Sequence, residues 1–251
     1  MRTGMGTFIA ISAQASTPHR ALSAIEAAFA AIEHVGTLMH PTRRGSDLAA
    51  IRQGGLNMPL PVHLWTWEVL ALSRRLNELS KGSFDPCLPS APGRLVDLEF
   101  APPQSVIAHK PLHIDLGGIA KGYAVDVALQ VLRAAGCHGG LVNAGGDLAA
   151  FGDRSYPVVV AEQGVARSVV EINNAALATT AVCSSVRPAE HRGYYDGANR
   201  REICTGSVTI CAPCAAIADG LTKCLLADPG ETSSALLATF GARVIAYRDP
   251  N

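Results

Sequence analysis

The sequence predicts a mixed α and β protein that folds as a single unit over residues 1–251. Hydrophobic residues make up 48% and charged residues 17% of the chain, below the usual charged share of about 25%, which indicates a compact globular protein. Two segments show helical periodicity, and short segments rich in β-formers alternate with helical ones. No internal repeat, low-complexity tract or linker divides the chain, so we expect one domain.

The N-terminal third predicts a strand followed by two helices. Residues 5–14 (MGTFIAISAQ) alternate β-formers with small residues, and Ser16–Pro18 form a turn. One buried helical face is predicted by residues three or four apart, namely Leu22, Ile25, Phe29, Ile32 and Val35. Gly36 is the expected end of that helix. The same spacing recurs at Val69, Leu72, Leu76 and Leu79, before Lys81 and Gly82.

The middle of the chain predicts an irregular segment and then a β-α-β alternation. Residues 88–111 carry many prolines and little periodicity, so we expect a long connection with ligand contacts at its edges. A strand at 112–116, a helix at 117–135 ending at Gly136, and a strand at 140–143 are expected to follow.

The C-terminal part predicts further strands and two helices. Strand-like segments lie at 156–161, 168–172 and 207–212, and a helix is expected at 215–226. Asp228 and Pro229 are the expected cap and first residue of a last helix that runs to Gly241. A strand at 243–247 closes the chain.

Charge and cysteine content narrow the function classes. Lysine plus arginine equals aspartate plus glutamate, 21 against 21, so no overall field attracts the protein to nucleic acid or an anionic membrane. We see neither a secretory signal at the start nor an apolar run of the roughly 18–20 residues that span a bilayer, and we expect a cytoplasmic protein. The seven cysteines, Cys211 and Cys214 of a CxxC pair included, are expected to be buried thiols rather than disulfides or metal ligands.

Two glycine clusters stand where predicted strands end, at 115–122 (DLGGIAKG) and 143–147 (NAGGD). Glycine lets a backbone approach a ligand closely, and amides at a helix start favour an anion, so the clusters are suited to a phosphate or pyrophosphate. The alternative is that these glycines serve tight turns. Neither cluster matches the dinucleotide fingerprint or the Walker loop.

Asp219, Thr222 and Lys223 share one face of a predicted helix. One interpretation is an exposed Asp-Lys pair worth a few tenths of a kcal/mol. The other is ligation of a hard cation such as Mg²⁺ by carboxylate and hydroxyl oxygens. No HExxH or GxSxG motif supports a zinc peptidase or a serine hydrolase.

A series of motifs along nearly the whole chain is similar to a known family. The motifs are MGT at 5–7, Met39 followed by SDL at 46–48, GSFDP at 82–86, DLGGIAKGYAVD at 115–126, NAGGD at 143–147, LATT at 177–180 and AD at 218–219. In this order they resemble the ApbE family, the FAD:protein FMN transferases.

The resemblance implies an α+β, T-fold-like domain of mixed sheets with packed helices, which binds FAD in a cleft. It implies a reaction in which a threonine hydroxyl of an acceptor flavoprotein attacks the FMN-side phosphorus and AMP leaves, with Mg²⁺ countering charge. The implied partners are FAD and that acceptor protein, without nucleic acid or a membrane span.

The resemblance also assigns candidate site residues by position. Cofactor contacts are implied for Met5, Thr42, Ser83, Phe84, Asp85, Asp115, Gly117, Lys121, Gly145 and Gly146. Metal contacts are implied for Gly118, Asp219 and Thr222, and catalytic roles for Asp219, Lys223 and His191.

The chain departs from the family pattern at two positions. The metal helix usually reads D-x-x-x-T, but here the fourth residue after Asp219 is Lys223. Two unit charges 4 Å apart repel by about 4 kcal/mol at an effective dielectric near 20, so either Lys223 points away and Thr222 ligates, or lysine replaces the metal. We favour replacement, because a lysine can serve phosphates as a point charge.

The second departure concerns a family histidine that is a candidate for proton transfer. Its position holds Gly193, with His191 nearby, and loss of such a group costs about 10²- to 10⁴-fold in rate. Three hypotheses follow: an FMN transferase with altered metal use, a flavin-binding carrier, sensor or partner subunit that has lost transfer, and an FAD pyrophosphate hydrolase, which needs the metal and is disfavoured.

Overall fold

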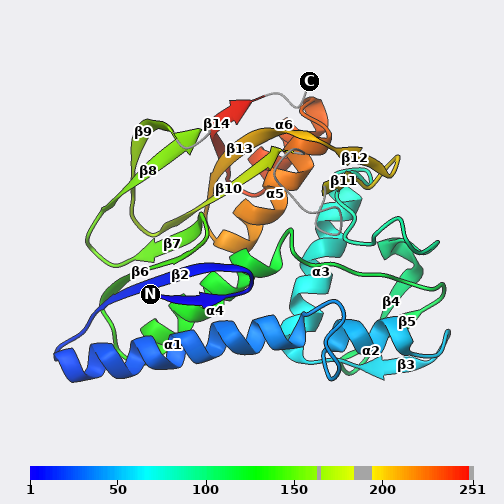
Figure 1. Ribbon diagram of the computed structural model, residues 1–251, viewed down its shortest axis with the longest axis horizontal. Coiled ribbons are helices and arrows are strands. Elements are labelled where there is room, and N and C mark those ends of the chain that lie inside the picture. The colour runs from blue at the N-terminus through cyan, green and yellow to red at the C-terminus, as the bar shows by residue number, and fades with distance from the viewer. Residues whose placement is uncertain (163–164, 184–193, 249–251) are drawn as a thin grey trace.

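The fold is built on a seven-stranded antiparallel sheet with strand order β1-β2-β6-β7-β10-β13-β14 (Figure 1). The computed structural model describes residues 1–162, 165–183 and 194–248. The strands of this sheet are β1 (Arg2–Gly4), β2 (Thr7–Gln14), β6 (Gly139–Ala144), β7 (Asp147–Phe151), β10 (Ala175–Cys183), β13 (Thr205–Ala212) and β14 (Arg243–Arg248). The α+β class predicted from the sequence is confirmed.

Helices cover one face of this sheet and a β-hairpin covers part of the other. The helices are α1 (Pro18–Leu38), α4 (Ala120–Ala134) and α5 (Ala215–Ala227), with α6 (Glu231–Thr239) beside α5. Their apolar faces form the main core with the inward side chains of β2, β6, β10 and β13. On the opposite face, the hairpin β8 (Tyr156–Glu162) and β9 (Val165–Ile172) packs on a smaller cluster that includes Leu148, Leu177 and Cys211.

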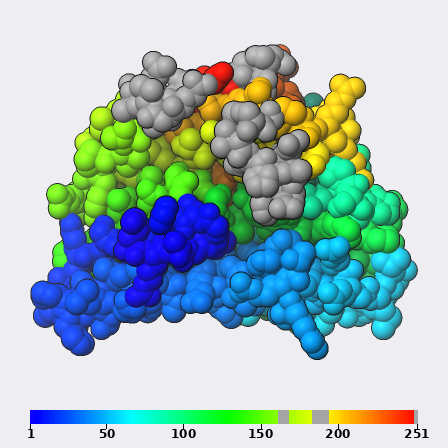
Figure 2. Space-filling model, in the orientation of Figure 1, coloured from blue at the N-terminus to red at the C-terminus, as the bar shows by residue number. Residues whose placement is uncertain are grey.

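A second layer lies beside the main sheet, on the right in Figure 1. It contains α2 (Asp47–Gln53), α3 (Leu64–Leu79), the 3₁₀-helix η1 (Leu95–Asp97), the sheet β3 (Pro59–Pro61), β5 (Ser105–Ala108) and β4 (Leu98–Ala101), and the pair β11 (Tyr194–Asp196) and β12 (Arg201–Ile203). Figure 2 shows the N-terminal strands on the molecular surface beside the region of α4 and β7. The segments that meet between the two layers supply the candidate site.

Helix α1 runs past its expected end. Thr17 caps its first turn by accepting the Arg20 N–H, and Pro18 occupies the first helical position. The prediction that Gly36 ends the helix is wrong, because the helix continues to Leu38. A Cβ on Gly36 would lie 3.1 Å from Met5 Cγ, so this glycine makes room for the β1–β2 turn.

By length and composition, α1 is also the one described helix that could cross a membrane. This finding corrects the expectation that no segment reaches that length. The core helix of a folded protein passes the same test, and the buried side of α1, which includes Ala28, Phe29, Ile32 and Val35, packs in the main core.

Two further sequence predictions are wrong in the middle of the chain. The segment 88–111 is not irregular throughout, because it contains η1 and the β4–β5 hairpin, which pairs with β3. The expected strand at 112–116 is reduced to one isolated bridge between Cys87 and Ile114. The β-α-β alternation therefore does not form, and α4 is followed by the β6–β7 hairpin.

Helices α4 and α5 make a close backbone contact at Gly122. A Cβ at this position would lie 2.6 Å from the Ala215 carbonyl carbon and 2.8 Å from Ala216 N. Asp126, one turn further along α4, accepts hydrogen bonds from Ala215 N and Ala216 N, both at 2.8 Å, and so caps α5. The glycine and the aspartate of the motif at 115–126 thus fix α5 against α4.

Gly122→Ala is therefore expected to destabilise the fold. Because the added methyl group meets backbone rather than a movable side chain, the free energy of unfolding should fall by about 1–3 kcal/mol or more. Urea unfolding followed by circular dichroism measures the change. Gly55→Ala is the matched control, since Gly55 is exposed and a Cβ there meets only Met58 Cγ at 3.5 Å. Equal stability of the two variants would contradict the close contact.

Among the cysteines whose side chains the structure describes, the prediction of buried free thiols is right for four and wrong for two. Cys87, Cys137, Cys211 and Cys224 are buried free thiols, whereas Cys214 is half-buried and Cys204 is exposed. Burial, aided by nearby Asp126, raises the pKa of Cys214 to about 11, which leaves it protonated and unreactive at neutral pH.

Candidate functional site

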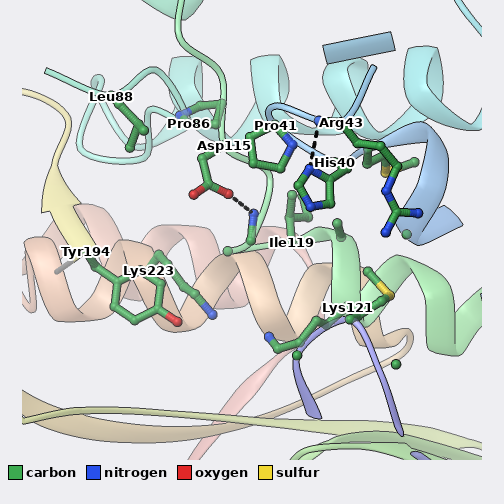
Figure 3. A pocket seen from close by; sticks show the side chains of 18 of the residues that line it. His40, Pro41, Arg43, Pro86, Leu88, Asp115, Ile119, Lys121, Tyr194 and Lys223 are labelled. Carbon is green, nitrogen blue, oxygen red and sulfur yellow. Dashed lines mark hydrogen bonds between the residues drawn. The ribbon is translucent and has the colours of Figure 1, made fainter. Parts of the chain in front are cut away.

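A cavity of about 1110 Å³ opens between the main sheet and the second layer. Its walls come from the β1–β2 turn, the end of α1 with residues 39–43, the loop at 83–90, the start of α4, and β11. Figure 3 shows Lys121 and Lys223 entering it from one side, with Asp115, His40 and Arg43 on the opposite wall. The cavity slightly exceeds the range of about 300–1,000 Å³ for small-molecule sites, which suits a dinucleotide-sized ligand.

The structure brings most of the predicted site residues together. The cavity is lined by Met5, Ser83, Phe84, Asp85, Asp115, Gly117, Gly118, Lys121 and Lys223. Asp219 and Thr222 lie directly beneath Lys223 and are fully buried. Thr42, Gly145 and Gly146 are not among the lining residues, and His191 lies outside the described residues.

The positions of Gly145 and Gly146 are explained by the turn that they form. Both have positive φ, 67° and 99°, in the β6–β7 turn, a conformation that favours glycine. A Cβ on Gly145 would lie 2.9 Å from Thr7 Cβ, and Gly146 N donates to Asn143 Oδ1 at 3.0 Å. The described contacts of these two glycines are those of a tight turn packed against β2.

Met5 and Thr42 flank the cavity in different ways. Met5 and Gly6 form the two-residue β1–β2 turn with φ of 48° and 74°, as in a type I′ hairpin. Met5 lines the cavity there. Thr42 donates its backbone N–H to His40 Nδ1 at 3.2 Å, and its neighbours Pro41 and Arg43 line the cavity instead.

The loop at 83–87 is held by hydrogen bonds to its own aspartate. Asp85 Oδ1 accepts Cys87 N–H at 2.9 Å and Leu95 N–H at 3.3 Å. Burial outweighs these bonds and raises the pKa of Asp85. Gly197 N donates to Ser83 O at 2.8 Å, and a Cβ on Gly197 would lie 2.8 Å from Asp85 N. The loop is thus fixed before any ligand arrives.

Asp115 faces the cavity at the entrance to α4. It is exposed, and its Oδ1 accepts Gly117 N–H at 2.8 Å (Figure 3). This bond shapes the turn that leads into the first residues of α4, whose positive dipole end favours an anion. Asp115 is therefore placed to position both the turn and a polar ligand group.

Two lysines and two carboxylates form a buried cluster at the base of the cavity. Lys121 Nζ lies 2.6 Å from Asp147 Oδ2 and 3.7 Å from Asp219 Oδ2. Lys223 Nζ donates to Asp219 Oδ1. The carboxylates are 1% and 0% exposed at Asp147 and Asp219, whereas the side chain of Lys121 is 23% exposed. The cluster carries two positive and two negative charges, and its lysines face the cavity.

These pairings shift the pKa values in opposite directions. Burial of Asp219 acts to raise its pKa, but the positive charges of Lys223 and Lys121 outweigh burial and lower the pKa. For Asp147, burial and the neighbouring Asp219 charge raise the pKa to about 6. Burial also acts to lower the pKa of Lys121, yet the Asp219 and Asp147 carboxylates raise it above the usual lysine value. Both Asp219 and Lys121 are therefore charged at neutral pH.

Threonine hydroxyls complete the surroundings of Lys223. Its Nζ donates to Thr180 Oγ1 at 2.7 Å and to Thr222 Oγ1 at 3.0 Å. The two hydroxyls lie 2.7 Å apart, and Thr222 Oγ1 donates to the Asp219 carbonyl at 2.6 Å. Thr180 belongs to the LATT motif on β10, so that motif contacts the base of the cavity through Lys223.

The residues at this position do not fit the Mg²⁺ that the family resemblance implies. Asp219 Oδ1 is occupied by Lys223 Nζ, and Thr222 Oγ1 is engaged by Lys223 and Thr180. A Cβ on Gly118 would lie 3.3 Å from both Cγ and Cε of Lys223, so the lysine stem covers this glycine. Within the described ranges, no group of three or more His, Cys, Asp or Glu side chains could hold a metal.

Several cavity residues were missed by sequence reasoning. Arg2, Phe29, His40, Arg43 and Tyr194 line the cavity. The ring centroid of Tyr194 is 5.1 Å from Lys223 Nζ, within the range of a cation–π contact (Figure 3). The sequence signal for His40 was its position beside Met39 of a quoted motif, whereas Phe29 was recognised only as a residue of the buried helical face.

The chain is similar to known proteins along nearly its whole length. The model of the ApbE family matches residues 5–100 and 94–246. The chain is similar to the apo flavinyl transferase ApbE of Pseudomonas stutzeri, with 20% identity over 99% of this chain and 90% of that chain and a TM-score of 0.81. A histidine-to-glycine mutant of the flavin transferase ApbE from Vibrio cholerae gives 21% identity over 97% and 91%, with a TM-score of 0.83.

A third solved structure has the same architecture. The apbe protein of Thermotoga maritima shares 21% identity over 99% of this chain and 95% of that chain, with a TM-score of 0.78. The comparison with curated proteins gave no significant match. At these identities the likeness to the solved structures shows the fold.

Proposed function

The chain belongs to the ApbE family, and from this membership we propose that it is an FAD:protein FMN transferase. Its substrates are FAD and a threonine hydroxyl of an acceptor flavoprotein, and its second product is AMP. The printed names of two structural neighbours, flavinyl transferase and flavin transferase, support this proposal.

One observation supports the proposal most strongly: two lysines and the start of a helix meet at the base of a dinucleotide-sized cavity. Lys121 and Lys223 line the cavity from α4 and α5, and Gly117 and Gly118 precede the first turn of α4. Cationic side chains and the positive dipole end of a helix are groups that bind a pyrophosphate. Apolar side chains, among them Met5 and Phe84, line the same cavity and suit the flavin ring.

The transfer requires one bond to form and one to break. The threonine oxygen forms a bond to the FMN-side phosphorus, the bridging P–O bond breaks, and AMP leaves with that electron pair. Lys121 and Lys223 stabilise the negative charge on the pyrophosphate oxygens. The hydroxyl proton passes to a base, for which His191 remains the sequence candidate.

Mass spectrometry tests this function. The protein is incubated with FAD and threonine-bearing acceptor proteins, and the acceptor mass is followed. An increment equal to a phosphodiester-linked FMN, lost when the target threonine is replaced by alanine, is the expected result. FAD binding without any increment across several acceptors would contradict the transferase.

A second candidate is a flavin-binding protein that has lost transfer, acting as a carrier, sensor or partner subunit. The observation that favours it is the engagement of Asp219 and Thr222 by Lys223, in place of a metal. The same experiment separates the two: bound yellow flavin in the purified protein without acceptor labelling identifies the binding protein.

A further inference from the structure

We infer that Lys223 is a built-in cation, so that this protein binds the pyrophosphate of a flavin dinucleotide without a divalent metal. The identity of the ligand rests on the proposed function. The replacement of the metal rests on the contacts of Lys223 itself, which Figure 3 shows directed toward the same region as Lys121.

The ammonium of Lys223 uses the oxygens that a hard cation would need. It contacts Asp219 Oδ1, Thr180 Oγ1 at 2.7 Å and Thr222 Oγ1 at 3.0 Å. Carboxylate and hydroxyl oxygens are the ligands that Mg²⁺ prefers. Three oxygens for three N–H donors satisfy the lysine completely, and the oxygens have no vacant place for a metal while it remains.

The carbon stem of Lys223 closes the approach from the side of α4. It packs on Gly118, whose Cβ would lie 3.3 Å from Lys223 Cγ and Cε. The side chain is 8% exposed, so it is held in place between α4, β10 and β11 rather than extended into solvent. A metal could enter only if this buried lysine left, which would unpair its charge.

Charge balance points the same way. Lys121 and Lys223 together offset Asp147 and Asp219, and adding a divalent ion would give this cluster an excess of two positive charges in a poorly solvated place. The ligand instead meets the ammonium of Lys223, which is already part of this balance and acts on the pyrophosphate as a point charge. Binding is then independent of metal.

The first experiment uses the wild-type protein. FAD affinity is measured by flavin fluorescence with EDTA and with excess Mg²⁺, and the two dissociation constants should agree within about threefold. A wild-type protein that binds FAD only with Mg²⁺ would overturn the inference and leave the proposed function standing. Failure to bind FAD under either condition would instead overturn the proposed function.

The second experiment changes the cation. Lys223→Thr frees Asp219 Oδ1 and adds a hydroxyl, so its FAD affinity should become about tenfold or more tighter with Mg²⁺ than with EDTA. Lys223→Met is the matched control, because it keeps a stem over Gly118 but adds no oxygen ligand. This variant should bind FAD more weakly than wild type and respond little to Mg²⁺.

A direct metal measurement accompanies these titrations. With FAD present, Mn²⁺ should give the electron paramagnetic resonance signal of a bound ion in Lys223→Thr and not in wild type. Circular dichroism checks that each variant is folded. If a variant is not folded, the comparison of wild-type FAD affinity with EDTA and with Mg²⁺ still tests the inference. Unchanged, metal-independent affinity in a folded Lys223→Thr would show that the ammonium contributes nothing and would overturn the inference.

Discussion

Replacing Asp219 with alanine is expected to lower the free energy of unfolding by about 3–5 kcal/mol. The side chain is fully buried, accepts from Lys223 Nζ and from Gly122 N at 3.2 Å, and lies 3.7 Å from Lys121 Nζ. Its removal leaves a nearly buried ammonium without a counter-ion, which costs far more than losing an exposed pair. Urea unfolding of the purified variant measures the loss.

Two companion variants identify the cause. Glu26→Ala removes the exposed carboxylate that pairs with Arg2 and should change stability by less than about 1 kcal/mol. The double variant Asp219→Ala/Lys223→Met removes both members of the buried pair, so it should be more stable than Asp219→Ala alone. If the double variant were less stable than the single one, the loss would come from packing rather than from an unpaired charge.

The helices were the most predictable part of the fold. As predicted, Phe29, Ile32 and Val35 lie on the buried side of α1 and Leu76 on that of α3, because a helix repeats its contacts within a few residues of sequence. The prediction is wrong for Leu22 and Leu79, which are exposed near the start of α1 and at the end of α3. The ends were less predictable. Gly36 lies inside α1 and leaves room for Met5, which the β1–β2 turn brings next to it, and the local sequence carries no sign of this contact.

Several strands were missed because their partners determine them. The motif LATT lies in β10 between β7 and β13. One face of β10 is covered by α5 and the other by the β8–β9 hairpin, so the strand does not show the alternation of apolar and polar residues by which a half-exposed strand is recognised. Leu112–Leu116 reads as a strand by composition, yet only Ile114 finds a partner. The β-propensity of a segment carries no information about whether a neighbouring strand is available to pair with it.

The site was predictable as a set of residues and not as a set of contacts. The motifs around Asp115, Lys121 and Asp219 brought the right segments together. From the sequence, Lys223 could either turn away or replace a metal. Only the fold, by placing Thr180 of β10 at 2.7 Å from its Nζ, shows that Lys223 does not turn away, and replacement of the metal is our proposal. The spacing of side chains on α5 carries no information about β10.

Lys121→Met is expected to weaken FAD binding about 100-fold, the largest loss of affinity that we predict. Lys121 lies at the start of α4, lines the cavity and is 23% exposed, so a pyrophosphate can reach its ammonium. The carboxylates of Asp219 and Asp147 outweigh burial and raise its pKa, which keeps it charged. A charge-assisted bond to a phosphate oxygen contributes about 1.5–3 kcal/mol, and the upper part of this range corresponds to about 100-fold in affinity.

The same change alters how stability depends on pH. Burial and Asp219 already raise the pKa of Asp147 to about 6, and loss of its Lys121 partner at 2.6 Å raises it further. A carboxyl whose folded-state pKa exceeds its unfolded value gives stability below the unfolded pKa and loses it as pH rises through the folded pKa. Lys121→Met should therefore be destabilised less at about pH 5 than at about pH 8.

Flavin fluorescence titration and urea unfolding at the two pH values measure these effects. Lys110→Met is the matched control, because Lys110 is 57% exposed, pairs with Asp97 and does not line the cavity. Its FAD affinity should equal that of the wild type. If Lys121→Met also bound FAD with wild-type affinity, the pyrophosphate would not lie beside the α4 terminus, because no ligand there can avoid this ammonium.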